Sequence, residues 1–517
     1  MYQPQSKSLL SDGSGGDGGE NSPSATAPNA GIPFVVAQPK YEEVDGSLAW
    51  RDRPWAIAFM IHFGCVCFLA FFYGTKAVSA DALSGGSSSV SKGSFDLNAD
   101  VFIRALVIGS FCAAITTILL FSVLRRLAGG LIRASILVSG SVQILAGAGL
   151  IASGLFIGGV LVLTGLLAFA YYWCARSRIA FAAAHVTIAT RALDKASGLW
   201  LVAAGCLIAQ LLWSFIWGLA ALGVEYVINN NNGKTATTSG STATTSDGGF
   251  SGTLSTFLML ISYFWGSIFI RNVAAFTAAS VVGDYWWKGD TEKAPTMGAV
   301  RRALTTSFGS LSLSALLVSV VRAAQAIAKA KSKEARRDGH IAIIILACLA
   351  QCIISVLAAI LEWANQWAIV FCALTGLAFK PAGLSVWTLF KRRGFDMIVN
   401  DDLVGSALSF ASLVSAAVGA LSGGALAYAL DTSEWRVFHA GTAAVLCFFI
   451  AMMLASVIAS FVETATRAVF VSWALSPGVS FFRDEANVIL ILGAQSGLFL
   501  TPSPHPTPTS LPPSLSL

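Results

Sequence analysis

Long apolar segments alternate with short polar segments along most of the chain. Each apolar run is close to the length of about 20 residues that an α-helix needs to cross roughly 30 Å of hydrocarbon. An α-helix satisfies its backbone hydrogen bonds internally, as the interior of a bilayer requires. The pattern therefore predicts about ten membrane-spanning helices. Their expected ranges are 54–73, 101–124, 131–152, 155–174, 198–223, 252–282, 307–327, 341–361 continuing through 366–380, 403–430 and 437–461.

The amino-acid composition leads to the same fold class. Hydrophobic residues make up 55% of the 517 residues and charged residues only 12%. That is more apolar surface than a single soluble core can bury. We therefore predict an all-α fold class, a polytopic helical membrane protein with the lipid bilayer as its surroundings.

The two ends of the chain differ from its middle. Residues 1–50 are rich in Ser, Gly, Pro and Asn without apolar periodicity, which predicts a disordered tail. Three basic residues just before the first span, Lys40, Arg51 and Arg53, predict that this tail is cytoplasmic. The transmembrane domain is predicted to cover 51–463. A C-terminal tail, 464–517, follows and is Pro- and Ser-rich at its end.

Charge in the loops predicts the orientation of the spans. The loops at 74–100 and 224–251 carry few Lys or Arg, whereas 176–195 and 288–302 are basic. Because cytoplasmic loops are enriched in Lys and Arg, the first pair is expected outside and the second pair inside. The basic segment Lys329–Arg337 falls on the outside by this count. Either the apolar run after it makes two passes, or this segment is an exception to the rule.

Two further patterns concern local structure. Segments 176–195 and 384–393 are too polar to span the membrane and resemble amphipathic helices in the cytoplasmic interface, with Arg178 and Lys195 expected to reach lipid headgroups. Gly154 and Gly158 form a GxxxG pair, for which close helix packing is the expected role.

Several classes of function are disfavoured. The net charge of +6 is scattered, so no nucleic-acid partner is expected. The nine cysteines lie in apolar runs without CxxC spacing, and the five histidines are isolated, so neither a disulfide framework nor a metal site is expected. The HExxH, GxSxG and phosphate-loop motifs are missing. We expect a protein that is not an enzyme and needs no cofactor.

Candidate binding chemistry concentrates between residues 362 and 402. Glu362, Asn365 and Gln366 fall at membrane depth beside Trp363 and Trp367. Polar groups are costly in hydrocarbon and usually face a cavity or a partner. The two tryptophans are four residues apart, so they share one face of a helix. A carboxylate next to two aromatic rings is a combination that can hold an organic cation.

Three stretches resemble the choline transporter-like family, solute carrier family 44. They are RNVAAFTAASVVGDYWW at 271–287, ALTTSFGSLSLSALLVSVVRAAQ at 303–325 and NQWAIVFCALTGLAFKPAGLSVWTLFKRRGFDMIVNDDLVG at 365–405. The resemblance extends over about 50–480, and the short first loop is similar to the fungal and protist branch. Ser314-Ala315 and Leu377 depart from the family pattern.

This resemblance implies transport of choline or a similar small organic cation, with the plasma membrane as the expected location. Glu362 would then be the counter-charge, and the amides would bind the substrate hydroxyl or support a broken helix. Two alternatives remain, a transporter of another small polar solute and a non-transporting membrane scaffold or sensor. The sequence carries no indication of oligomeric state. The full set of expected substrate-binding residues is Glu362, Trp363, Asn365, Trp367, Tyr263, Trp265, Asn272 and Trp213.

Overall fold

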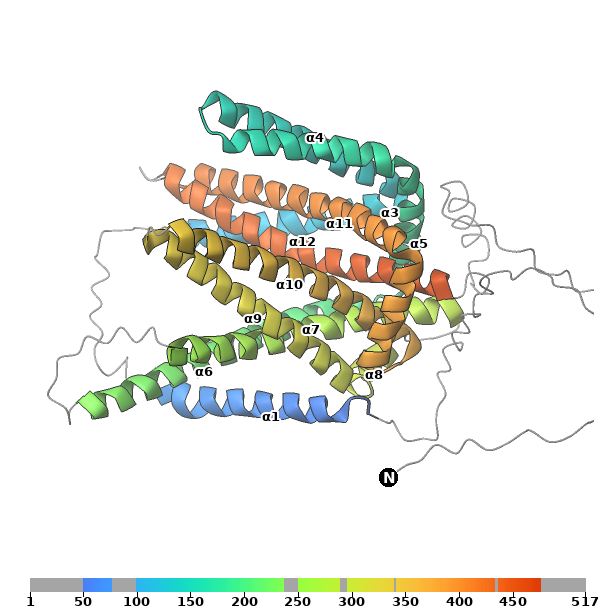
Figure 1. Cartoon of the computed structure of the whole chain (residues 1–517). Coiled ribbons are helices and arrows are strands. Elements are labelled where there is room, and N and C mark those ends of the chain that lie inside the picture. The colour runs from blue at the N-terminus through green and yellow to red at the C-terminus, as the bar shows by residue number, and fades with distance from the viewer. Residues whose placement is uncertain are drawn as a thin grey trace, which may run out of the picture. The chain divides into compact units, whose positions relative to one another are not determined.

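A computed structural model describes residues 50–76, 99–236, 250–288, 295–338, 341–432 and 436–475. The helices run in the order shown in Figure 1. They are α1 (Arg53–Leu69), the π-helical turn η1 (Ala70–Gly74), α3 (Ala99–Ala152), α4 (Ile157–Ala175), the 3₁₀ turn η2 (Arg176–Arg178), α5 (Ile179–Lys195), α6 (Leu199–Ala236), α7 (Phe250–Lys288), α8 (Pro295–Leu304), α9 (Phe308–Asp338), α10 (Ile341–Thr375), α11 (Phe379–Leu430) and α12 (Arg436–Leu475).

The predicted fold class is confirmed. Within the described residues, nine helices are long and apolar enough to cross a membrane. A further apolar segment, Val107–Leu119, lies in the first half of α3. The backbone of α3 leaves helical geometry at Leu127, so its 54 residues form two consecutive helices rather than one. The chain is therefore a multi-pass helical membrane protein with about ten spans.

One end of the bundle is held together by Asp52, the residue before α1. Its carboxylate accepts hydrogen bonds from the Ser310 hydroxyl of α9 (2.6 Å) and from the Phe379 amide that begins α11 (3.0 Å). It therefore caps a helix far away in sequence, because a helix N-terminus leaves amide groups without intrahelical partners. Gly309 lies so close to the carbonyl oxygens of Arg51 and Asp52 that a Cβ atom there would overlap them. We call this end, where α5 and α8 also lie, the inner end.

Short helices cross the bundle at the inner end (Figure 1). Helix α5 buries one face, including Phe181 and Val186, against the long helices. The basic residues that were expected to reach headgroups also have contacts within the protein. Arg178 forms an ion pair with Asp396, and the ammonium group of Lys195 lies 5.0 Å from the ring centre of Tyr285. A kink at residue 393 likewise separates a short first segment of α11 from its long second segment.

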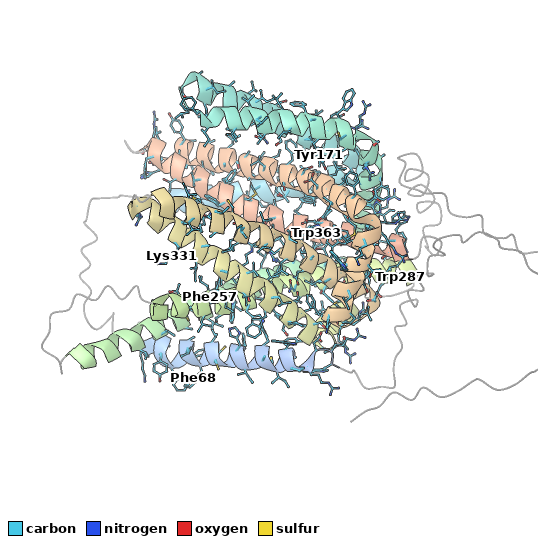
Figure 2. The ribbon with its side chains drawn as sticks, viewed as in Figure 1. Phe68, Tyr171, Phe257, Trp287, Lys331 and Trp363 are labelled. Carbon is cyan, nitrogen blue, oxygen red and sulfur yellow. The ribbon has the colours of Figure 1, made fainter. Side chains whose placement is uncertain are left out.

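The basic segment near the end of α9 lies at the opposite end of the bundle. Helix α10 is continuous from Ile341 to Thr375, so the alternative of two separate passes is wrong. Ser332 contacts Cys348 at 3.7 Å, so the end of α9 adjoins the start of α10. Figure 2 shows Lys331 at this end, far from α5. The segment is therefore an exception to the charge rule that oriented the other loops.

One boundary predicted from the sequence changes in the structure. Helix α12 continues past residue 463, where the transmembrane domain was expected to end, and Ala465 and Phe470 in this last part are fully buried.

The two glycines of the predicted GxxxG pair have different surroundings. Gly154 lies in the turn after α3 with φ of +83°, whereas Gly158 packs against Gly147 of the preceding helix. Most of the predicted tails, residues 1–49 and 476–517, lies outside the described residues.

Candidate functional site

The centre of the bundle contains a chain of buried polar side chains from α7, α9 and α10. The Asn272 amide donates to the Ser314 hydroxyl at 3.0 Å, and Ser314 donates to the Asn365 carbonyl oxygen at 2.8 Å. All three side chains are buried. The small serines of α9 allow the helices to approach, and their hydroxyls satisfy polar groups that lipid would leave without partners. The structure thus brings the two predicted asparagines together through Ser314.

Glu362 is the centre of an ion-pair cluster. Arg322 of α9 donates Nε to Oε1 at 3.0 Å and Nη2 to Oε2 at 2.5 Å. Arg271 of α7 donates Nη2 to Oε1 at 3.2 Å. Two guanidinium groups therefore face one carboxylate. The negative charge that the sequence offered for a substrate is matched within the protein in this conformation.

Trp363 and Trp367 lie on one face of α10, with ring centres 6.0 Å apart. Trp363 donates its indole N–H to Asp401 Oδ2 of α11 at 3.0 Å. Its ring meets Phe390 edge-on, and the ring of Trp367 meets Phe470 edge-on. Trp363, labelled in Figure 2, is partly buried. The pair therefore belongs to an aromatic cluster where α10, α11 and α12 meet.

A buried arginine of α12 faces this aromatic cluster. Arg467 is 5% exposed and donates to Asp401 at 2.7 and 3.0 Å and to Glu463 at 2.5 Å. Its guanidinium carbon lies 6.0 Å from the ring centre of Trp367. Trp367 is 0% exposed, and its indole N–H has no hydrogen-bond partner among the residues that the structure describes. An internal cation thus lies beside one of the two tryptophans that the sequence suggested for a substrate cation.

The charges around α10 balance one another. The three arginines that contact this region face three carboxylates, since Arg271 and Arg322 meet Glu362 while Arg467 meets Asp401 and Glu463. These six side chains therefore carry no net charge together.

The remaining predicted residues lie between α1, α6 and α7. Trp213 donates its indole N–H to the Tyr263 carbonyl at 3.0 Å. Trp265 donates to the Ser312 carbonyl at 2.9 Å and stacks on His62, with ring centres 4.7 Å apart. Their ring neighbours are therefore in α1 and α6 rather than in the Trp363–Trp367 pair. The eight predicted residues form two groups. Trp213, Tyr263 and Trp265 form the α1–α6–α7 group. The group centred on α10, or α10 group, contains Asn272, Glu362, Trp363, Asn365 and Trp367.

Ser314, Arg322 and Arg467 contact the α10 group but were not among the residues predicted from the sequence. The alternating serines of SFGSLSLS are a signal for close helix approach that could have identified Ser314. Arg322 and Arg467 are single basic residues within apolar runs, a pattern that marks intramembrane pairing. Glu362 and Asp401 lie on other helices, so the sequence did not indicate that these arginines would meet them. Glu463 lies four residues before Arg467 on α12, and helical spacing could have indicated that pair.

Comparisons with known proteins agree with this architecture. The profile of a family described as "Plasma-membrane choline transporter" matches residues 159–477. Protein PNS1 of Yarrowia lipolytica is 32% identical over 257 residues, which cover 48% of this chain and 44% of the relative. Protein PNS1 of Mycosarcoma maydis is 29% identical over 233 residues, covering 45% and 42%. For Protein PNS1 of Neurospora crassa the values are 24% over 324 residues, covering 62% and 57%.

The aligned regions span about half the length of these fungal relatives. The family profile begins within α4 and ends just after α12, and so includes every helix of the group centred on α10. Because the profile covers more than half of the chain, this protein belongs to the choline transporter-like family.

Proposed function

We propose that the protein carries choline, or a closely related small organic cation, across the plasma membrane without chemical change to the substrate. The observation that carries this proposal is the family profile, whose description names choline transport at the plasma membrane and whose match includes α7, α9, α10 and α12. The multi-pass helical bundle supplies the framework that such transport needs.

The α10 group supports the proposal through its chemistry. A quaternary ammonium ion has no N–H donor, so proteins hold it with aromatic faces, each worth roughly 0.5–2 kcal/mol, and with negative charge. Trp363 and Trp367 supply the faces. Asn272 and Asn365 supply amides for the substrate hydroxyl. We propose that the substrate takes the place of the Arg467 guanidinium beside Trp367 during transport.

Glu362 has a different role in this proposal. Its carboxylate offsets two arginines, so Glu362→Gln would leave Arg271 and Arg322 without their partner. The local potential would become more positive, and a cation would bind more weakly whether or not it touches the carboxylate. For the α1–α6–α7 group, Trp213, Tyr263 and Trp265, we propose contact with the substrate at an earlier or later step.

Uptake of labelled choline into vesicles that contain the purified protein tests the function. Wild-type protein should take up choline, and Trp367→Leu should raise KM by about ten- to thirtyfold because it removes a ring face. Trp286→Leu is the matched control. Trp286 is 1% exposed, and its indole N–H also lacks a partner. The control should lose as much packing as Trp367→Leu while it keeps the KM of the wild type.

The alternatives give different results in the same vesicles. A transporter of another small polar solute would show uptake of that solute that excess choline does not inhibit. A scaffold or sensor would show no uptake of either compound. Equal KM values for wild type, Trp367→Leu and Glu362→Gln, at normal protein yield, would exclude the α10 group as the binding site and leave the family membership unaffected.

A further inference from the structure

A cavity of about 180 Å³ lies where α3, α5, α6 and α12 meet, and its lining includes none of the residues of the α10 group. Thr190 of α5 and Phe461 of α12 are buried and form its inner wall. Trp200 of α6, 58% exposed, and Asp194 of α5 lie at its exposed side. Helix α5 ends one residue after Asp194, so the cavity is at the inner end of the bundle.

The lining of this cavity has the chemistry that a quaternary ammonium ion requires. Phe121, Trp200 and Phe461 provide three aromatic side chains, and Asp194 provides a carboxylate. Aromatic faces together with a negative charge are the usual means by which proteins recognise such ions. The combination of three rings and one carboxylate around a single space therefore favours an organic cation over an anion or a sugar.

Thr190 adds a group that can recognise a hydroxyl. Its hydroxyl proton is directed to the backbone carbonyl of Val186 at 2.9 Å or of Thr187 at 3.0 Å. A threonine oxygen that donates in this way keeps lone pairs that accept a hydrogen bond. The hydroxyl group of a hydroxyalkyl ammonium ion can donate to it. A wall with one acceptor and three rings thus matches both ends of choline.

The size of the cavity limits its occupant. A volume of about 180 Å³ is far above the roughly 10–15 Å³ that admits one water molecule. It is also below the roughly 300 Å³ at which sites for drug-sized ligands begin. A small ion fits this range, whereas a nucleotide or an oligosaccharide is too large.

The α10 group is closed in the same conformation. Trp367 is fully buried, and Arg467 lies beside its ring. A cation from solution therefore reaches that ring only after the structure rearranges, whereas the cavity is open in this conformation. Helix α12 connects the two places, because Phe461 in the cavity wall and Arg467 are six residues apart, or roughly 9 Å along the helix axis.

We propose that this cavity is a second binding site for a small quaternary ammonium ion, on the side of the membrane predicted to be cytoplasmic. Soluble choline occupies it before or after it contacts the α10 group. This inference rests on the proposed transport of choline. The choline headgroup of a phospholipid carries the same ammonium group, and the test below separates the two sources.

Binding of labelled choline is measured with the full chain in nanodiscs made of phosphatidylethanolamine and phosphatidylglycerol, which contain no choline. Trp200→Leu should raise Kd by about two- to fivefold, the scale of a cation–π contact at an exposed site. Asp194→Asn should raise Kd by up to about fivefold, because it removes an exposed charge. Trp387→Leu is the matched control, because Trp387 lies at the same end of the bundle and is 57% exposed. It should bind choline like the wild type.

Three results decide the inference. Wild-type affinity in both Trp200→Leu and Asp194→Asn would overturn it. Loss of soluble choline binding when phosphatidylcholine is added to the nanodiscs would also overturn it, because the lipid headgroup would then be the occupant. Absence of choline uptake by wild-type protein in vesicles would instead refute the proposed function. Size-exclusion profiles equal to that of the wild type exclude misfolding, which is not expected for the exposed Trp200.

Discussion

Replacing Asp401 by asparagine tests whether the buried ion pair with Arg467 organises the junction of α10, α11 and α12. Asp401 accepts two hydrogen bonds from Arg467, at 2.7 and 3.0 Å, and one from the Trp363 indole at 3.0 Å. Asparagine can still accept the indole N–H, but it removes the charge that faces a guanidinium with 5% exposure.

The expected cost follows from the burial of Arg467. Removal of one partner from a buried ion pair usually costs about 3–5 kcal/mol, because it leaves an uncompensated charge. Glu463 still accepts from Arg467 Nη2 at 2.5 Å, so we expect a value at the lower end, about 3 kcal/mol. Arg271→Gln is the control, since Arg271 is 48% exposed and leaves Glu362 paired with Arg322. An exposed pair of this kind contributes about 0–1 kcal/mol.

The free energy of unfolding can be measured by steric trapping in bicelles for Asp401→Asn, Arg467→Gln and the double variant. Residues in contact are not additive, so the double variant should cost less than the sum of the single variants by about 1–3 kcal/mol. Asp401→Asn with no larger cost than Arg271→Gln, or an additive double variant, would refute the reasoning. Either result would mean that packing alone holds this junction.

Two further predictions concern packing and topology. Gly147→Ala should lower stability by about 1–3 kcal/mol, because the added Cβ would lie 2.6 Å from the Gly158 carbonyl oxygen. Gly149→Ala is the control and should not lower stability, because no described atom lies within 4 Å of the Cβ added there. Equal thermal stability of the two variants would contradict this prediction. Cysteines introduced at Ser197 and Lys331 should react with a membrane-impermeant maleimide from opposite sides, because the two positions lie at opposite ends of the bundle; labelling from one side would contradict the topology.

Much of the fold was predictable because a bilayer restricts the possible structures. Apolar runs of sufficient length become helices in lipid, since only internal hydrogen bonds satisfy their backbones. The expected span 252–282 accordingly lies within α7, and 198–223 lies within α6 apart from its first residue. The end of α12 was not predictable from hydropathy, because its last turns are buried by other helices rather than by lipid. The side on which Lys329–Arg337 lies was also left open, and only the continuity of α10 decided it.

The sequence by itself determined that Trp363 and Trp367 share a helix face, because residues four apart are neighbours on an α-helix. It also identified Glu362 and the two asparagines as polar groups that need partners in the membrane. Only the tertiary structure decided which partners they have. Arg322 of α9 reaches Glu362, and Ser314 of α9 links the two asparagines. Such pairings depend on how the helices pack, which helical periodicity does not encode.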